Sequence, residues 1–245
     1  MEKPIKCIIV EMNMKRFILK RDGKDKGTDS VYPDLNPENI PSQYALNRTQ
    51  NYFSTFLPDD TSFKGMIPEY IGDNPPKQVH TICDMHDFIR KKPYAQVYSV
   101  SKRFKELLEK FTIPNTKFYE GSVVWNEKEY PYFVWHILTQ QFSFVDFEKS
   151  LFCDTNYFSK DAIGTEYYKV SDFSKLYPLK KEKKWDMWGF YRAVMKPEFR
   201  EVDVYEMDYY GIVISERLKE AIESAQLTNV SITPCPIEFE ISDQI

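Results

Sequence analysis

The sequence contains one short unit twice, at a spacing of 114 residues. The segment "VYSVSKRFKELLEKFTIPN" runs from Val97 to Asn115, and "GIVISERLKEAIESAQLTN" runs from Gly211 to Asn229. Self-similarity at a fixed spacing indicates a structural unit that recurs in the fold. Over residues 101–115, six positions are identical in the two copies: Ser101/Ser215, Arg103/Arg217, Lys105/Lys219, Glu106/Glu220, Glu109/Glu223 and Asn115/Asn229.

Each copy has the pattern of a strand, a capped helix and a return strand. Ser101 and Ser215 are placed to accept a hydrogen bond from an early helix amide, as an N-cap does. The return strands are expected in "TKFYEGSVVW" and "VSITPC". Between cap and return strand, apolar residues recur at the i, i+3, i+4 and i+7 spacing of an amphipathic helix: Phe104, Leu107, Leu108 and Phe111, then Leu218, Ala221, Ile222 and Ala225.

These patterns predict an α+β fold with two lobes of mixed or antiparallel sheet and amphipathic helices, which an internal duplication would relate. The N-terminal lobe is expected at residues 1–125, with its strand–helix–strand unit at 97–120. The C-terminal lobe is expected at 126–245, with its unit at 211–233. Convergence is the alternative, because capped helices in general favour Ser, Lys and Glu at such positions. In separate lobes the two cap serines share no partner, so the costs of replacing each by Ala, about 0.5–2 kcal/mol, should add.

The composition limits the classes of function. The chain has 245 residues, 33 of them basic and 37 acidic, and a formal net charge of −4. This balance argues against nucleic-acid binding, which goes with a basic patch or stripe. No stretch approaches the ~18 apolar residues of a membrane span, so no membrane partner is expected. The apolar run Cys7–Val10 is too short and too closely flanked by charge for a signal peptide, and the four scattered cysteines indicate reduced thiols in the cytoplasm.

Motifs for cofactors and catalysis are absent from the sequence. The chain has 8 glycines and contains no G-x-G-x-x-G, no G-x-x-x-x-G-K-[ST], no G-x-S-x-G and no H-E-x-x-H. A dinucleotide fold, a P-loop, a hydrolase elbow and a zinc protease therefore lack their usual sequence support. The sequence predicts no cofactor and no enzyme activity.

One group of residues has metal-ligand chemistry. In "HTICDMH", His80, Cys83 and His86 lie at i, i+3 and i+6 of a segment whose apolar spacing favours a helix. These residues would bind zinc with a fourth ligand from elsewhere, such as His136 or Cys153, although structural zinc sites usually combine two close pairs. The competing interpretation is a buried Cys83 beside two partly exposed histidines. A metal-dependent enzyme or zinc-binding protein stays the alternative to a protein without a cofactor, and a Cys–His nucleophile pair would lack an orienting third group.

Two further segments are candidates for partner binding. Aromatic residues at three-residue spacing in "KKWDMWGFYR" are of the types that dominate binding hot spots, although such a stripe also suits a core. Acidic residues in "DVYEMDYY" suggest a solvated rim for a basic partner, with an acid–base pair as the alternative. The candidates are Trp185, Trp188 and Tyr191 in the first segment, and Asp203, Glu206 and Asp208 in the second.

The C-terminal run "GIVISERLKEAIESAQLTNVSITPC" resembles the closing signature of a family of bacterial immunity proteins from polymorphic toxin systems. This family was long known only as a domain of unknown function. The earlier run "YSVSKRFKELLEKFTIPNTKFYEGSV" resembles a second family segment, and "VDFEKSLF" stands where the family tends to have "lDlekS". The resemblance covers roughly the C-terminal two thirds. Asn229 stands where the family prefers Gly, but Asn also tolerates the left-handed conformation of such a helix end.

The resemblance implies a non-enzymatic antidote in the cytoplasm. Such a protein binds a cognate bacterial toxin domain and blocks it by protein–protein interaction. The quoted motifs are packing motifs and imply no catalytic residue. A regulatory binding scaffold would have the same sequence features, so it stays an alternative.

Overall fold

The computed structural model describes residues 14–22, 30–32, 63–69, 82–87, 97–138, 142–155, 166–207 and 211–242. In this part of the chain the fold is α+β, with three sheets of mixed or antiparallel strands and three α-helices. The chain divides into two compact units. Unit 1 comprises residues 1–16, 142–201 and 234–245, and unit 2 comprises 17–141 and 202–233.

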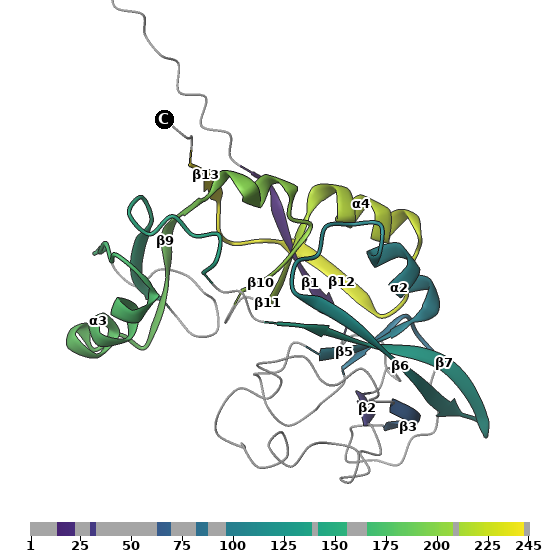
Figure 1. The fold of residues 1–245 in the computed structure, drawn as a ribbon. Helices are drawn as coiled ribbons and strands as arrows, with labels where there is room; N and C mark the ends of the chain where they lie inside the picture. The colour runs from purple at the N-terminus through teal and green to yellow at the C-terminus, as the bar shows by residue number, and fades with distance from the viewer. Residues whose placement is uncertain are drawn as a thin grey trace, which may run out of the picture. The chain divides into compact units, whose positions relative to one another are not determined.

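Unit 2 is built around two sheets and two helices (Figure 1). The first sheet has the order β2-β3-β6-β7-β5-β4, and the second has the order β10-β11-β1-β12. The first sheet and its helix comprise β2 (Ser30–Tyr32), β3 (Phe63–Glu69), β4 (Met85–Asp87), β5 (Val97–Ser101), α2 (Lys102–Leu108), β6 (Thr116–Trp125) and β7 (Lys128–Ile137). The second sheet and its helix comprise β1 (Arg16–Arg21), β10 (Val204–Met207), β11 (Gly211–Ser215), α4 (Glu216–Ser224) and β12 (Val230–Pro234).

The two sheets share a strand order. An antiparallel pair, β4 and β5, leads into α2, and an antiparallel pair, β10 and β11, leads into α4. The next strand in each sheet is a central strand, and the strand after it is the return strand that follows the helix. The central strand differs in origin: β7 follows β6 directly, whereas β1 comes from near the N-terminus. The four-stranded sheet is therefore complete only when a strand more than 180 residues away in sequence joins it.

Both helices begin at the predicted serines. Ser101 accepts a hydrogen bond from the Phe104 amide and Ser215 accepts one from the Leu218 amide, each at 3.2 Å. Both serines have extended backbone angles, as N-cap residues do. The helices lie next to each other in Figure 1. Their buried side chains Phe104, Leu108, Leu218 and Ile222 belong to one core together with residues of both sheets.

This shared core differs from the expected division into lobes. The sequence predicted a boundary between residues 125 and 126, with one strand–helix unit on each side. In the structure both units belong to unit 2, and their apolar stripes pack into the same cluster, around Trp135 and Leu19. The physical reason is that each short helix buries only one stripe, and two stripes meeting in one core exclude more water than either alone.

The expected helix in the histidine–cysteine segment is also wrong in the part described. Residues 85–87 form strand β4, which pairs with β5 in the register Met85↔Val100 and Asp87↔Tyr98. Met85 and His86 are both buried although they point to opposite faces of the sheet. A short apolar run of this kind cannot be assigned by periodicity alone, and here the ladder with β5 decides its conformation.

Unit 1 is a three-stranded sheet with an aromatic interior. Its order is β13-β9-β8, with β13 parallel and β8 antiparallel to β9. Its described elements are β8 (Leu151–Thr155), the 3-10 helix η1 (Phe173–Lys175), α3 (Leu176–Lys183), β9 (Met187–Met195), the 3-10 helix η2 (Pro197–Glu201) and β13 (Phe239–Ile241). Phe152 packs on Phe190 at 5.0 Å between ring centroids, and Phe199 packs on Phe239 at 5.5 Å. Among the helices of the described segments, none combines the length and apolar character that crossing a membrane requires.

Candidate functional site

The residues shared by the two copies converge on a buried aspartate in each. We call the first set the Asp84 network. Asp84 accepts hydrogen bonds from Ser101 Oγ at 2.6 Å and from Arg103 Nε and Nη2 at 3.0 and 2.5 Å. It also accepts from the amide and hydroxyl of Thr228 at 2.7 and 2.9 Å. Burial alone raises the pKa of Asp84, but these donors outweigh it and hold the pKa at about 2.

The second set, the Asp203 network, has the same construction. Asp203 accepts from Ser215 Oγ at 2.5 Å, from Arg217 Nε and Nη2 at 2.5 and 2.7 Å, and from the Thr112 amide at 2.8 Å. Its backbone carbonyl accepts from the Ser215 amide at 2.9 Å, as the Asp84 carbonyl does from Ser101. Burial raises the pKa of Asp203, while Arg217, Ser215 and Thr112 together lower it below its ordinary value.

The two networks are reciprocal. Thr228, which follows α4, donates to Asp84, which precedes the β4–β5 pair and α2. Thr112, which follows α2, donates to Asp203, which precedes the β10–β11 pair and α4. Each carboxylate therefore holds the start of one helix and the chain beyond the end of the other. Charge-assisted, bidentate bonds of this kind are among the stronger hydrogen bonds in proteins. The networks stabilise the fold and leave the carboxylates without an open face for a ligand.

This geometry contradicts the expected solvated acidic rim at two of its three residues. Asp203 and Glu206 are 0% and 2% exposed, so neither belongs to a solvated rim for a basic partner. Asp208 lies outside the described residues. Sequence reasoning also missed Asp84, because the Asp-to-Ser spacing is 17 residues in the first copy and 12 in the second. A comparison at one fixed offset does not align the two aspartates, although the motif Asp–strand–strand–Ser-x-Arg is present twice.

The Cys83 and His86 side chains lie together in the core. Cys83 Sγ is 3.2 Å from Nε2 and 3.4 Å from Nδ1 of His86, so it approaches the ring between its two nitrogens rather than along one of them. Asn229 Nδ2 donates to the Met85 carbonyl at 2.6 Å and approaches Cys83 Sγ at 3.4 Å. The Tyr132 hydroxyl donates to the Cys83 carbonyl, and burial raises the pKa of that phenol. Asn229 has the left-handed φ of 59° that its place after α4 predicts.

These contacts describe a packed polar cluster. The interpretation without a metal expected a buried Cys83 beside two partly exposed histidines. Cys83 is buried, but His86 is fully buried as well. His80 lies outside the described residues. Within the described ranges, no group of three or more His, Cys, Asp and Glu side chains is arranged to hold a metal ion. Cys153 is buried in unit 1, where burial and then Asp154 raise the pKa of its thiol to about 11, so it is a poor nucleophile at neutral pH.

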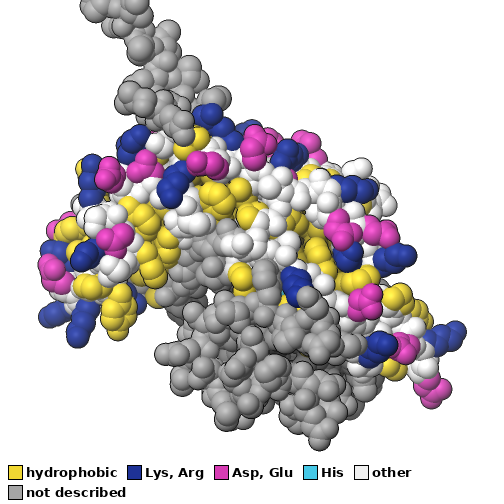
Figure 2. Space-filling model, in the orientation of Figure 1, with side chains coloured by type: hydrophobic (Ala, Val, Ile, Leu, Met, Phe, Trp, Pro, Cys, Tyr) yellow, Lys and Arg dark blue, Asp and Glu magenta, His cyan; other side chains and the backbone are white. Residues whose placement is uncertain are grey.

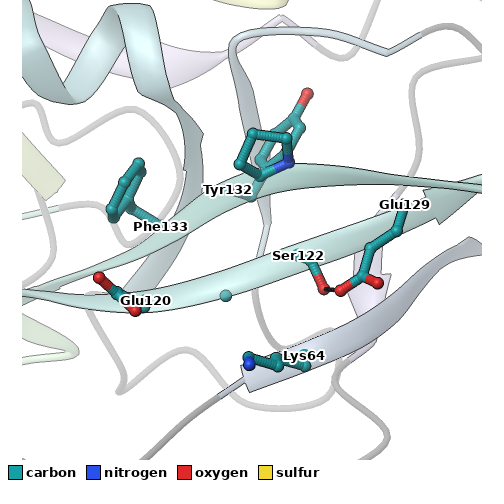
Figure 3. A pocket seen from close by; sticks show the side chains of 8 residues that line it. Lys64, Glu120, Ser122, Glu129, Tyr132 and Phe133 are labelled. Carbon is teal, nitrogen blue, oxygen red and sulfur yellow. Dashed lines mark hydrogen bonds between the residues drawn. The ribbon is translucent and has the colours of Figure 1, made fainter.

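An open pocket of about 440 Å³ lies on the six-stranded sheet (Figure 3). Ser122 Oγ donates to the carboxylate of Glu129 and accepts from the Gly65 amide at 2.8 Å. The hydroxyl thereby links β3, β6 and β7, and its acceptor is a carboxylate rather than an imidazole base. The lining combines one lysine, two glutamates and two aromatic residues; its members are Lys64, Glu120, Gly121, Ser122, Glu129, Pro131, Tyr132 and Phe133.

Exposed aromatic side chains gather in unit 1. The large hydrophobic residues that are exposed in the described part of the chain are Tyr167, Phe173, Tyr177 and Tyr191, and all four belong to this unit. Tyr167 stacks on Tyr191 at 4.7 Å between centroids with an interplanar angle of 18°. Figure 2 shows hydrophobic side chains at the surface of the part that carries α3 and β9, interspersed with basic and acidic ones. Exposed aromatic residues such as these are typical of protein-binding surfaces.

The three aromatic residues that the sequence groups together differ in exposure in the structure. Tyr191 is 53% exposed and belongs to the candidate binding surface. Trp188 is buried and packs against Phe142 at 5.3 Å between centroids, so it is a core residue. Trp185 is half-buried and lies 5.5 Å from the ring of Tyr168. Trp185 precedes β9, and within β9 the pairing with β8 is irregular between Phe190 and Arg192, which leaves Tyr191 at a β-bulge.

The chain matches no model of a known protein family, and no curated protein matches it.

Proposed function

We propose that this chain is a cytoplasmic, non-enzymatic immunity protein that binds and neutralises a cognate bacterial toxin domain. The observation that carries the proposal is the gathering of exposed aromatic side chains in unit 1. Surface aromatics with apolar faces and polar tips supply most of the energy in many protein–protein interfaces. The kind of partner, a toxin domain, is inferred from the resemblance to immunity proteins.

The residues in the segments that carry the resemblance hold the fold together. In the two strand–helix units, the shared serines and arginines bind Asp84 and Asp203. In "VDFEKSLF", Ser150 is buried and its hydroxyl donates to the Val194 carbonyl at 3.1 Å and accepts from the Val194 amide at 3.0 Å. These residues are used in holding the fold, so the partner-specific residues are expected on the surface, where they can differ between proteins that neutralise different toxins.

We also infer that the two strand–helix units arose by internal duplication. The support is that strand order, serine cap, arginine and aspartate recur together in both copies. Convergence would explain the caps, but it gives no reason for two bidentate Arg–Asp pairs at matching places. The test is an exchange of residues 101–108 for 215–222. If the units are equivalent, the exchanged chain should keep its fold and unfold cooperatively in urea. A chain in which the same positions are scrambled at constant composition is the control.

Neutralisation by binding makes a stoichiometric prediction. The toxin domain of the neighbouring reading frame should stop growth when expressed alone, and co-expression of the full chain should restore it. In a purified system, toxin activity should fall linearly with added chain and reach its minimum at one equivalent. Full inactivation by about a hundredth of an equivalent would instead indicate an enzyme. Failure of a soluble, folded chain to restore growth would overturn the proposal.

A further inference from the structure

The segment from η1 through α3 carries four exposed side chains that we call the stripe: Phe173, Tyr177, Lys181 and Lys184. Tyr177 and Lys181 lie four residues apart in α3 and therefore share one side of this helix. Phe173 precedes the helix in η1, and Lys184 is its C-cap, with a left-handed φ of 57°. Phe173 is 47% exposed and Tyr177 is 74% exposed, whereas Leu176, on the inner side, is fully buried. Leu176 anchors this segment in unit 1, and Phe173 stacks with one face on Phe142 at 4.1 Å between centroids, while the rest of the stripe is exposed.

The lysines of α3 differ from those of the other two helices. In α2 and α4, lysines pair with glutamates one turn on: Lys102–Glu106 at 3.7 Å, Lys105–Glu109 at 2.5 Å and Lys219–Glu223 at 3.0 Å. Residues 175–184 carry five lysines and one glutamate, Glu182, which pairs with Lys183 at 3.2 Å. For Lys180, Lys181 and Lys184 the described residues offer no salt-bridge partner. This segment is strongly basic within a chain whose net charge is −4.

Position at a helix C-terminus explains only part of this pattern. Lysines there interact favourably with the helix dipole, so basic residues in the last turn of α3 are tolerated. The dipole does not explain why Tyr177 is 74% exposed one turn before Lys181. Lys180 and Lys184 also repel each other one turn apart, which destabilises a helix slightly. A segment that combines exposed aromatic area with positive charge is suited to binding.

We propose that the Phe173–Tyr177–Lys181–Lys184 stripe is the docking site for an acidic surface of the toxin domain. Carboxylates of the partner would pair with Lys181 and Lys184, while Tyr177 and Phe173 would be covered by its apolar groups. An acidic protein suits this stripe better than nucleic acid does, because the basic residues are confined to one short helix and include no arginine. The inference rests on the proposed function, since it names the surface through which neutralisation would occur.

The first test uses a simple probe and does not depend on the toxin. Amide shifts of the full chain are followed by NMR during titration with a decaglutamate peptide at low salt, and in parallel with decaglutamine and a ten-nucleotide RNA. Decaglutamate should shift the amides of residues 173–184, decaglutamine should not, and the shifts should disappear in the Lys181→Glu/Lys184→Glu variant. Decaglutamate shifts centred on α2 or α4, or RNA that shifts residues 173–184 at lower concentration than decaglutamate, would overturn the inference.

The second test uses the toxin domain itself. Lys181→Glu/Lys184→Glu and Tyr177→Ala should each weaken binding by roughly tenfold or more, and the first variant should lose most of its salt dependence. Lys110→Glu reverses an exposed charge outside the stripe and should leave the affinity within about twofold. If the wild-type chain neutralises the toxin and both stripe variants do so equally well, the docking site is wrong while the function stands. If the wild-type chain fails as well, the proposed function is wrong, and the peptide titration still decides whether the stripe binds acidic chains.

Discussion

At the residue scale, two buried aspartates connect the serine caps of α2 and α4 to arginines and to the opposite helix. Ser101 and Ser215 each cap a helix, but each also donates to an aspartate that an arginine holds from the other side. The arginine heads are about half exposed and the carboxylates are buried, so each pair keeps its cation partly hydrated. The networks therefore combine a cap, an ion pair and a link to the opposite helix.

The Asp84 network predicts a dependence of stability on acid pH. The folded pKa of about 2 lies below the ordinary value of 3.8, so the charged form is favoured by folding. This contribution is fully present above pH 4 and is lost as the pH falls towards 2; at neutral pH it amounts to about 2 kcal/mol. Urea unfolding of Asp84→Asn between pH 2 and pH 7 should show lower stability than wild type at pH 7 and a smaller decline on acidification. A variant with the full wild-type decline would contradict the assignment. Asp203→Asn should behave in the same direction.

The two cap serines should not act independently. Sequence reasoning predicts that the costs of Ser101→Ala and Ser215→Ala add, because it places the serines in separate lobes. In the structure, Asp84 binds Ser101 and also Thr228 beyond α4, so loss of one serine loosens the anchor of the other helix. Each single variant should still lose about 0.5–2 kcal/mol of unfolding free energy. The double variant should depart from their sum by roughly 0.5 kcal/mol or more, measured by chemical denaturation. Additivity within experimental error would show that the networks are energetically separate.

At the element scale, α2 and α4 make equivalent contributions to one core. Both are short, so their stability depends on the burial of an apolar stripe rather than on helix propensity. The stripe of each begins three residues after the cap, with Phe104 in α2 and Leu218 in α4, and both side chains are fully buried.

Truncation of these two side chains should be costly in both copies. Phe104→Ala should lower the unfolding free energy by about 3–5 kcal/mol and Leu218→Ala by about 2–5 kcal/mol, because each removes buried apolar atoms and leaves a cavity. Glu106→Ala and Glu220→Ala, at exposed positions of the same helices, should stay within about 0.5 kcal/mol of wild type. Urea denaturation of the four variants provides the comparison. A mild effect in one copy would mean that its helix is peripheral to the core.

At the scale of the whole molecule, the chain order and the spatial order differ. Strand β1 occupies a central place between β11 and β12, although more than 180 residues separate it from both. A central strand supplies hydrogen bonds to two neighbours, so its removal leaves two strand edges unpaired.

A C-terminal fragment of residues 126–245 should therefore not form the sheet of β10, β11 and β12. It contains these strands and α4 but lacks β1, and its Asp203 lacks Thr112. Most of unit 1 lies within the fragment, so the measurement is confined to residues 202–233. We expect their amide signals to be poorly dispersed and unprotected from hydrogen exchange, with the full chain as the control. Dispersed and protected amides at these residues would restore the two-lobe boundary at residue 125.

The outcome for individual predictions follows from the range of the interactions involved. Serine caps, apolar stripes and the left-handed Asn229 depend on groups within one or two helical turns, and the sequence determined them. Segment 82–89 is different: its apolar spacing favours a helix, but pairing with β5 makes residues 85–87 a strand. Among the candidate binding residues, Tyr191 is exposed and Trp188 is buried against Phe142, a difference that the three-residue spacing does not predict.

What the tertiary structure alone decided is which distant groups meet. From the sequence, Asp203 is expected at the surface, because no local pattern identifies Arg217 as its ion-pair partner or Thr112 as its hydrogen-bond donor. Its burial is possible only because those groups, one of them 91 residues away, replace the hydrogen bonds of water. The same holds for β1, whose central place depends on strands at the other end of the chain. Local sequence determined the repeated unit itself, and only long-range pairing decided that the two copies share one core.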